Sequence, residues 1–422
     1  MHKKIILPNG LRIITVPMLK TDTVTVLVLV ATGSKYETKE INGVSHFLEH
    51  MTFKGTKKHP TSLSIVEPLD RIGAQFNAFT SQEYTGYYAK ADAGHLDLVL
   101  DIISDITLNP NFDQNEIDKE RGVIIEEINM YDDDPMNKIG HDLWPELLYG
   151  DQPAGWSIAG KKEIITKLQR KDFVKYHNDH YVAPRTIIIV AGKINPENIL
   201  KKAKNLFKNI NSASGKEKLP TKESQNKPRV KTFYKKTDQT QIALGVRAYN
   251  IFDERRFALE ILATILGGGM SSRLFDLLRN KMGAAYYVRT SHDSATDTGD
   301  FATWAGIDNL RIEMIVKAIL GEYKKIKQNK VSKNELNKAK ERIEGSLILS
   351  IETSDELASF YGSQEILKSE ILEPYDIIKK VQQVTISDVY EVANDIFRPE
   401  KLNLAMIGPA KDGKKLENLL KL

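Results

Sequence analysis

The sequence predicts an α+β protein made of two homologous α/β-sandwich domains, in each of which helices pack against a mixed or antiparallel sheet. Two observations lead to this prediction. Short strand-like apolar runs occur together with long helical patterns, and the helices follow one another rather than alternating strictly with strands. In addition, the second half of the chain repeats features of the first half at a nearly constant distance.

The predicted strands are apolar runs bounded by turn residues. Pro8-Asn9-Gly10 is a turn signal between two such runs and predicts an N-terminal hairpin. The run 24–31 is rich in valine and too short to span a bilayer, so we interpret it as a buried strand. The strands expected are Lys4–Leu7, Leu11–Val16, Thr23–Ala31, Tyr84–Ala89, Gln241–Val246, Ala285–Thr290 and Leu402–Ile407.

The internal repeat consists of two pairs of matching features. The helical segment Asn115–Lys119 (NEIDK) corresponds to Asn334–Lys338 (NELNK), 219 positions later. Each half also ends in an apolar run followed by a glycine, and these glycines, Gly192 and Gly408, are 216 positions apart. Two nearly equal offsets in the same order indicate duplication of a domain of about 200 residues.

A polar segment divides the two halves. Residues 209–229 are rich in Ser, Lys, Pro and Asn and almost free of apolar residues, which is typical of a linker. The sequence therefore predicts one domain at 1–208 and a second, homologous domain at 230–422.

Composition and charge exclude several classes of protein. The net charge of +4, from 60 basic and 56 acidic residues, argues against a dedicated nucleic-acid binder. The chain has no cysteine, so any metal ion must be held by His, Asp or Glu. No apolar run near the N-terminus is long enough for a signal peptide or a membrane span. We therefore expect a soluble, cytoplasmic protein that binds neither nucleic acid nor a membrane.

A short motif, HFLEH at 46–50, has the spacing of a metal site. Ser45 is a reasonable N-cap for a helix that begins at His46, and residues four apart on a helix share one face. His46 and His50 can therefore bind one ion, while Glu49 lies at the edge of the same face and reaches a water molecule rather than the ion. Two histidines at this spacing also occur on ordinary helices, but the H-x-x-E-H order is the inverted zinc-protease signature.

A catalytic zinc ion needs a third protein ligand, which must here come from a carboxylate. The helical segment 119–131 reads KERGVIIEEINMY and contains three candidates. Glu120 and Glu127 are seven residues apart and share a face, so Glu127 could bind the ion and Glu120 could hydrogen-bond a ligand histidine. Glu126 competes with Glu127 as the ligand, and the alternative for Glu120 and Glu127 is that both are solvated surface carboxylates.

Together, HFLEHMTFKGT and ERGVIIEEINMY resemble the inverzincin peptidases, the family of pitrilysin, insulin-degrading enzyme and mitochondrial processing peptidase. The resemblance extends over nearly the whole chain. It selects Glu127 as the third zinc ligand, with Glu120 behind the ligand histidine, and it implies one zinc ion per chain because the second half lacks the motif. It implies a zinc metalloendopeptidase in which Glu49 is the general base.

The same resemblance implies residues that bind the substrate. Asn77 and Ala78 match the family's Asn-Ala pair on an edge strand at 77–80, which also contains Phe79 and to which the peptide adds as a further strand. Phe53 could line an apolar side-chain pocket. Pro68, in the helix before this strand, predicts a kink or an early end of that helix.

In the second half, Arg279 and Tyr286 match the family's Arg/Tyr pair, which would stabilise the oxyanion. The run GGGMSS at 267–272 lacks the spacing and the lysine of a phosphate-binding loop, so nucleotide binding is disfavoured.

The length of the chain resembles the short-chain branch of the family, in which two subunits form one chamber. We therefore expect a dimer, most simply a homodimer, although a related partner subunit is an alternative. We expect short or unfolded peptides as substrates. The rival function is a non-catalytic peptide-binding or assembly subunit with the same fold.

Overall fold

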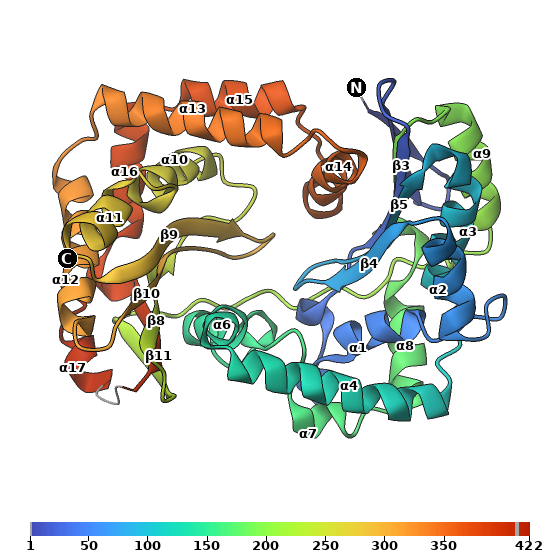
Figure 1. Ribbon diagram of the computed structural model, residues 1–422, viewed down its shortest axis with the longest axis horizontal. Coiled ribbons are helices and arrows are strands. Elements are labelled where there is room, and N and C mark those ends of the chain that lie inside the picture. The colour runs from blue at the N-terminus through green and yellow to red at the C-terminus, as the bar shows by residue number, and fades with distance from the viewer. Residues whose placement is uncertain (1, 410–412) are drawn as a thin grey trace. The chain divides into compact units, whose positions relative to one another are not determined.

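The computed structural model describes residues 2–409 and 413–422 and shows two compact units that combine sheet and helices (Figure 1). The predicted fold class is confirmed. The first unit consists of Met1–Asn129, Trp156–Leu219 and Leu349–Ile371, and the second of Met130–Gly155, Pro220–Ile348 and Leu372–Leu422. Each half of the chain therefore contributes one helical segment to the unit that is built mainly by the other half. Residues 211–228, within the expected linker, contain no helix or strand.

A six-stranded sheet forms the centre of the first unit. Its strand order is β1-β2-β6-β3-β5-β4, with β2 and β6 parallel and the other neighbouring pairs antiparallel. Strand β4, which the sequence predicts in part, lies at one edge of this sheet. The strands are β1 (Lys3–Ile6), β2 (Arg12–Pro17), β3 (Thr23–Val30), β4 (Gln75–Thr80), β5 (Thr85–Asp92) and β6 (Thr186–Gly192).

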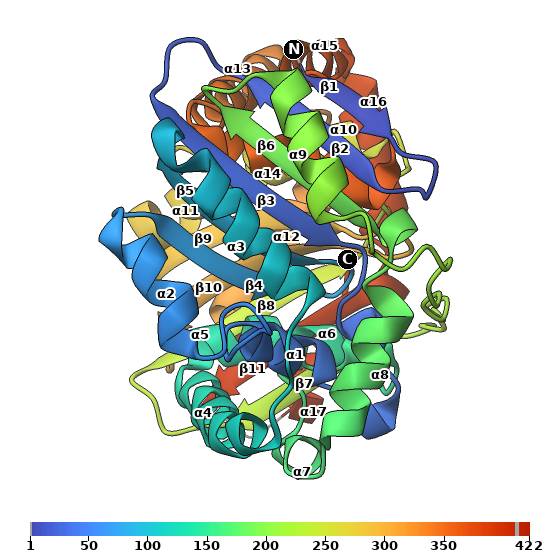
Figure 2. The same cartoon turned by 90° about the vertical axis from the view of Figure 1, so that its right-hand side faces the viewer.

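Helices cover both faces of this sheet, which is why β3 reads as a nearly continuous apolar run. On one face Val26 and Val28 pack in a core shared with α1, α3, α8 and α9. Of these helices, α3 and α9 lie in front of the strands in Figure 2. On the other face Leu27 and Leu29 pack with α14, which comes from the C-terminal half of the chain. The helices are α1 (Val44–Thr52), α2 (Ser62–Arg71), α3 (Leu96–Leu108), α4 (Gln114–Asp133), α7 (Lys162–Ile165), α8 (Arg170–His180), α9 (Pro196–Leu206) and α14 (Ser354–Lys368).

Helix α2 continues past Pro68 to Arg71, so the early end that the sequence predicts does not occur. A proline removes the hydrogen bond to the carbonyl four residues earlier, which here belongs to Ser64. That carbonyl lies 3.1 Å from the Nδ1 atom of His59, which can donate the missing hydrogen bond. A side chain outside the helix therefore offsets part of the cost of the proline.

A five-stranded sheet forms the centre of the second unit. Its order is β7-β11-β8-β10-β9, with β7 and β11 parallel and the other neighbouring pairs antiparallel. The strands are β7 (Arg229–Tyr234), β8 (Gln239–Arg247), β9 (Ala285–Ser294), β10 (Gly299–Asp308) and β11 (Leu402–Gly408).

The two sheets repeat one topology. Strands β2 to β6 and strands β7 to β11 have the same spatial order, and the parallel pair occupies the same place in both. Gly192 ends β6 and Gly408 ends β11, so the repeat in the sequence corresponds to equivalent strands. The edge strands β4 and β9 are equivalent in the same way.

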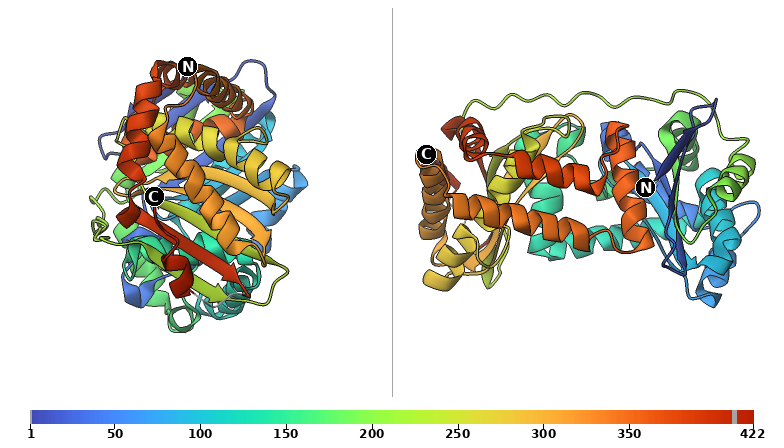
Figure 3. Two further views of the ribbon diagram at one scale, coloured as in Figure 1. Left: turned by 90° about the vertical axis from the view of Figure 1, so that its left-hand side faces the viewer. Right: turned by 90° about the horizontal axis from the view of Figure 1, so that it is seen from above.

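Helices also cover both faces of the second sheet. Helices α10, α12 and α16 share a core with one face, and they lie in front of the strands in the left view of Figure 3. The other face carries small side chains such as Ala243 and Ala405, against which Leu143 and Trp144 of the N-terminal half pack. None of the described helices has the length and apolarity of a membrane span. The helices are α5 (Pro135–Lys138), α6 (Trp144–Tyr149), α10 (Arg256–Gly267), α11 (Arg273–Phe275), α12 (Ile312–Gln328), α13 (Lys333–Leu349), α15 (Pro374–Gln383), α16 (Ile386–Ile396) and α17 (Gly413–Glu417), with π-helical turns at Ile139–Leu143 and Asp276–Lys281.

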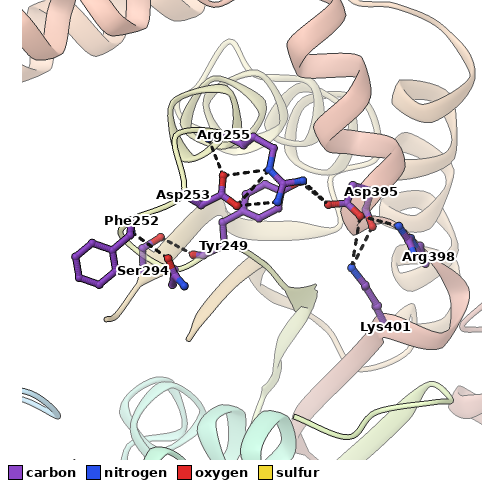
Figure 4. Close-up of polar contacts among 9 residues, drawn as sticks. Tyr249, Phe252, Asp253, Arg255, Ser294, Asp395, Arg398 and Lys401 are labelled. Atoms are coloured by element: carbon purple, nitrogen blue, oxygen red, sulfur yellow. Dashed lines mark hydrogen bonds and ion pairs between the residues drawn. The ribbon is translucent and has the colours of Figure 1, made fainter. Parts of the chain in front are cut away.

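A network of charged side chains in the second unit connects the loop after β8 to α16 (Figure 4). The Tyr249 hydroxyl donates to Asp395 Oδ2 at 2.8 Å, and Arg255 Nη1 donates to the same oxygen at 3.0 Å. The Arg255 guanidinium also lies 4.0 Å from the centroid of the Tyr249 ring and pairs with Asp253 at 2.7 Å. Arg398 pairs with the other oxygen of Asp395 at 2.7 Å. This network is structural, since every charge in it faces an opposite charge.

Candidate metal centre

Helix α1 carries the HFLEH motif, and a buried carboxylate rather than Ser45 caps its N-terminus. The helix begins after Gly43, whose φ of 98° is a left-handed conformation that favours glycine. The Glu37 carboxylate accepts from the backbone N–H groups of Gly43 and Ser45, both at 2.8 Å, and from the Ser45 hydroxyl and the Asn42 amide. The prediction of Ser45 as N-cap of a helix that begins at His46 is therefore wrong, because the helix begins at Val44 and Ser45 lies in its first turn. Burial raises the pKa of Glu37 to about 7, although these hydrogen bonds act in the opposite direction.

Three side chains converge beside this helix. His46 and His50 lie one turn apart on α1, and Glu127 reaches them from α4. The Nε2 atoms of His46 and His50 lie 3.6 and 3.5 Å from the two oxygens of Glu127, and one ligand atom from each residue lies within 4.8 Å of the others. The competing carboxylate, Glu126, is exposed to solvent.

The geometry of this group fits a zinc ion. Two ligands of a tetrahedral zinc ion with bonds of about 2.0–2.1 Å lie about 3.3–3.4 Å apart, close to the distances between Glu127 and the two imidazoles. Two imidazole nitrogens and one carboxylate are also a ligand set that catalytic zinc sites use, with a fourth position left for water or substrate. Among the residues that the structure describes, His46, His50 and Glu127 are the one group of three or more His, Asp or Glu side chains that could hold a metal ion.

Glu120 fixes the orientation of one histidine. Its Oε1 atom lies 3.0 Å from Nδ1 of His50, and its Oε2 atom pairs with Lys54 at 2.5 Å. Burial alone would raise the pKa of Glu120, but His50 and Lys54 outweigh it and lower the pKa. Conversely, burial lowers the pKa of His50, and the surrounding carboxylates outweigh it and raise the pKa. A proton on Nδ1 that is donated to Glu120 leaves the lone pair of Nε2 directed at the centre.

Glu49 lies beside the three converging side chains and is held from the sheet. Its side chain is buried, and its Oε2 atom accepts a hydrogen bond of 2.7 Å from the hydroxyl of Thr80 at the end of β4. Burial raises the pKa of Glu49, while the charge of His46 and the Thr80 hydrogen bond act in the opposite direction. A carboxyl group with a raised pKa at a fixed position suits a general base and acid.

The expected substrate residues lie on or near the edge strand β4. The backbone N–H of Ala78 donates to the Asn77 side chain at 2.9 Å rather than to a neighbouring strand, so it lies on the open edge. Phe79 turns toward the face of the sheet that α14 covers, where its ring meets Tyr84 edge-to-face at 5.9 Å. Phe53 is half-buried against the core on the face of α1.

Arg279 and Tyr286 belong to the second unit. Arg279 lies in the π-helical turn at Asp276–Lys281, and Tyr286 lies near the start of β9 with 70% of its surface exposed. Arg279 donates a hydrogen bond to the Tyr286 carbonyl, and its guanidinium lies 5.3 Å from the centroid of the Tyr286 ring. The structure thus brings these two residues together, in a different unit from the histidines.

Three residues of the site were not found by sequence reasoning. Glu37 lies in the polar stretch SKYETKE, which looks like an exposed loop, and Lys54 looks like an ordinary surface lysine. Thr80 gave a usable signal, because strand alternation places Thr80 and Ala78 on one face and Phe79 on the other. Thr80 is the one of these two with a side chain that can donate a hydrogen bond to a carboxylate on that face.

Comparison with known proteins agrees with this fold. The model of the insulinase family, peptidase family M16, matches residues 12–162, and the model of the M16 inactive domain matches residues 167–343. The chain is 36% identical to YmxG of Bacillus subtilis over 97% of this chain and 99% of that protein, and 31% identical to SCO5738 of Streptomyces coelicolor over 96% and 89%. Both relatives are described as uncharacterized zinc proteases.

Solved structures agree. A protease from Helicobacter pylori aligns with a TM-score of 0.91 at 26% identity over 97% of this chain and 99% of that chain. A peptidase M16 inactive domain from Pseudomonas fluorescens aligns with a TM-score of 0.89 at 17% identity over 97% and 98%, which supports the fold alone. The chain belongs to the insulinase family of peptidases, family M16. The resemblance drawn from the sequence is thereby confirmed, and the relatives support a peptidase role and suggest zinc as the metal.

Proposed function

We propose that this chain is a zinc-dependent metalloendopeptidase that cleaves short or unfolded peptides. The observation that carries the proposal is the convergence of His46, His50 and Glu127 beside a buried glutamate, Glu49, that is not one of the three. His46, His50 and Glu127 would hold one zinc ion per chain. The bound ion would supply Lewis acidity for water and for the carbonyl group of the scissile bond.

The remaining steps belong to side chains of this protein. Glu49, positioned by Thr80, takes a proton from the attacking water and returns one to the leaving amine. Glu120 keeps the Nδ1 proton of His50 in place, so that Nε2 stays available as a ligand. The open edge of β4 binds the peptide backbone by adding a strand, which depends only weakly on the peptide sequence.

We propose that Arg279 and Tyr286 stabilise the oxyanion in a dimer, each subunit supplying the pair to the zinc site of its partner. This part rests on the family resemblance and on the pairing of Arg279 with Tyr286. A mixture of Glu49→Gln chains with Arg279→Ala/Tyr286→Phe chains should then recover part of the activity that each lacks alone. Failure to recover activity, in a mixture shown to exchange subunits, contradicts a site shared between identical subunits.

The test of the main proposal is the Glu49→Gln variant. We expect the variant to keep stoichiometric zinc and to lose about 10²–10⁴-fold in kcat/KM on a quenched fluorescent peptide, which is the usual contribution of a general base. Glu126→Gln, which changes an exposed glutamate, is the matched control and should cleave like the wild type. Unchanged cleavage by Glu49→Gln would disprove the mechanism. Zinc binding by a wild-type protein that cleaves no peptide would favour the non-catalytic subunit instead.

A further inference from the structure

Lys54 connects the two helices that carry the proposed metal ligands. Helix α1 ends at Thr52, and the N–H of Lys54 still donates to the Met51 carbonyl at 3.1 Å. The Lys54 ammonium group pairs with Oε2 of Glu120, on α4, at 2.5 Å. The lysine side chain is 25% exposed and the glutamate side chain 7%, so solvent screens this ion pair less than a pair on the open surface.

The two oxygens of Glu120 have different partners. Oε2 pairs with Lys54, and Oε1 lies 3.0 Å from Nδ1 of His50. His50 and Lys54 are four residues apart, so both can reach the same carboxylate from the end of α1. A carboxylate that is held at one oxygen keeps the other oxygen in a fixed direction. Lys54 therefore favours the arrangement in which Glu120 accepts from Nδ1 of His50 and leaves Nε2 for the metal.

The backbone beside Lys54 is fixed by the segment that leads into α4. Gly55, the next residue, has a φ of 137°, a conformation that favours glycine. Its carbonyl accepts a hydrogen bond of 2.9 Å from the N–H of Asn111. Thr56 forms an antiparallel bridge with Pro110. This turn sets the point from which the Lys54 side chain reaches α4.

Helix α4 has few buried attachments to the rest of the first unit. Of its 20 residues only Ile117, Glu120 and Ile124 are buried. The two isoleucines pack in the apolar core, and apolar contacts have little directional preference. The ion pair between Glu120 and Lys54 is directional, and it therefore restrains the rotation of α4 about its axis. That rotation also determines where Glu127 lies, two turns further along the helix.

We propose that Lys54 is a positioning residue of the metal centre, which acts through Glu120 on the orientation of His50. The proposal rests on the proposed function, because it assumes that His50 binds the metal ion. The ammonium group of Lys54 pairs with Glu120 rather than with one of the three proposed ligands. Its effect on the metal is therefore indirect.

Positioning and simple charge predict opposite results when Lys54 is replaced. A positive charge near the site repels a metal cation, so the loss of that charge alone would strengthen zinc binding. The loss of orientation would instead weaken zinc binding, as the loss of a hydrogen-bond partner behind a ligand does. The direction of the change in zinc affinity therefore separates the two roles.

The test is the zinc affinity of Lys54→Met, which keeps a long side chain and removes the ammonium group. We expect binding about tenfold weaker than in the wild type, the lower end of the usual loss for a partner behind a ligand. The measurement is competition with a chromophoric chelator. Lys54→Arg keeps an ion pair with Glu120 and should bind zinc more tightly than Lys54→Met. Lys58→Met removes a lysine that pairs with Asp101, and as the matched control it should bind zinc like the wild type.

The double variant Lys54→Met/Glu120→Gln shows whether Lys54 acts through Glu120. We expect it to bind zinc no more weakly than Glu120→Gln alone, because residues that act through one another are not additive. Losses that add fully in the double variant overturn the proposal. Unchanged or tighter zinc binding by Lys54→Met also overturns it.

Folding and hydrolysis are measured separately from zinc affinity. Each variant is checked for a wild-type circular dichroism spectrum, and Lys54→Gln replaces Lys54→Met if the latter does not fold. If zinc affinity falls as expected but the wild type cleaves no peptide, the role of Lys54 stands and the proposed hydrolysis fails. If the wild type cleaves peptides and Lys54→Met binds zinc as tightly as it does, the hydrolysis stands and the role of Lys54 fails.

Discussion

In the second unit the carboxylate of Asp395 is surrounded by hydrogen-bond donors, whereas in the first unit the carboxylate of Glu127 faces two imidazole rings. Asp395 receives the Tyr249 hydroxyl and the guanidinium groups of Arg255 and Arg398, all within 3.0 Å (Figure 4). The oxygens of Glu127 instead face imidazole nitrogens at 3.5 and 3.6 Å, and Glu49 adds a second carboxylate nearby.

This difference shows how a structural charge cluster can be distinguished from a metal centre. In the network of Asp395 the chain supplies both signs of charge, so the cluster is complete without a ligand. At the candidate metal centre, Glu120 favours a proton on the outer nitrogen of His50, so that the Nε2 lone pair of this ring points inward. Such lone pairs attract a cation, and this difference, rather than the number of charges, is why we propose the first cluster as the metal centre.

The largest effect that this comparison predicts is on metal binding. Glu127→Gln removes the carboxylate that we propose as the anionic ligand, so zinc affinity should fall by more than about 100-fold. This exceeds the usual loss for a residue that only hydrogen-bonds a ligand. Peptide cleavage should fall with it. Asp395→Asn and Glu126→Gln should bind zinc like the wild type, although each removes one carboxylate. The measurement is zinc competition with a chromophoric chelator, and equal affinity in Glu127→Gln and Glu126→Gln would contradict the assignment.

The next largest effect is on stability. It concerns Glu37, a buried carboxylate that accepts hydrogen bonds as Asp395 does. Glu37→Ala leaves the N–H groups of Gly43 and Ser45 without their acceptor, and it leaves the Asn42 amide with its hydrogen bond to the Ser157 carbonyl alone. The loss of stability should be on the order of 3 kcal/mol, since each unsatisfied buried donor costs about 1–3 kcal/mol and solvent relieves part of it. Denaturant unfolding at pH 8, where Glu37 is ionised, measures this loss.

Glu37→Gln is the matched control for this change, because it keeps one acceptor oxygen in place. It should be intermediate in stability between the wild type and Glu37→Ala. A Glu37→Ala protein as stable as the wild type would show that Glu37 does not hold the start of α1. Because α1 carries both histidines, zinc affinity should fall along with stability in Glu37→Ala.

Much of this site could be predicted from the sequence, because it depends on local periodicity. Helical spacing places His46 and His50 on one face of a helix, and Glu120 and Glu127 on one face of another. The choice of Glu127 rather than Glu126 came from the resemblance to the family. The strands at 23–31 and 402–407 could be predicted because continuous apolar runs indicate strands covered on both faces. The equal offsets also anticipated the repeated sheet topology.

What could not be predicted depends on partners that are distant in the sequence. The apolar face of α14 shows that the helix is buried but not that it covers the sheet of the first unit. In the same way, the apolar residues of the segment 130–155 do not show that it packs on the second sheet. Glu37 has no pattern of its own, because its function arises only where the loop folds back on α1. The early end expected at Pro68 does not occur, and the carbonyl that the proline leaves without its helical donor lies 3.1 Å from His59, a side chain outside the helix.

A smaller effect on metal binding comes from the residue behind His50. Glu120→Gln keeps the size of the side chain but offers a weaker acceptor to the Nδ1 proton and loses the ion pair with Lys54. Zinc affinity should fall about 10–100-fold, the usual cost of losing such a partner. Glu116→Gln, four residues earlier on the same helix and paired only on the surface with Lys119, is the control. An unchanged affinity in Glu120→Gln would show that His50 is oriented without it.

The smallest effect belongs to the network of Asp395, and it appears in stability rather than in metal binding. Burial raises the pKa of Asp395, but the Tyr249 hydroxyl and the cations Lys401, Arg255 and Arg398 outweigh it and lower the pKa below its ordinary value of 3.8. A lowered pKa means that the ionised carboxylate stabilises the folded state, and this stabilisation is fully present at pH values above the ordinary pKa. This contribution is lost as the pH falls through the lowered pKa.

Asp395→Asn should therefore destabilise the protein by about 1 kcal/mol at neutral pH, the usual value for partly exposed charge pairs and hydrogen bonds. In a unit of this size that loss lowers the Tm by about 2–4 °C. The difference from the wild type should shrink below pH 4, because the wild-type carboxyl is then becoming protonated. Asp238→Asn, at an exposed aspartate, should show neither change. A difference that grows toward low pH would mean that the network does not favour the ionised form of Asp395, and it would remove the contrast with Glu127.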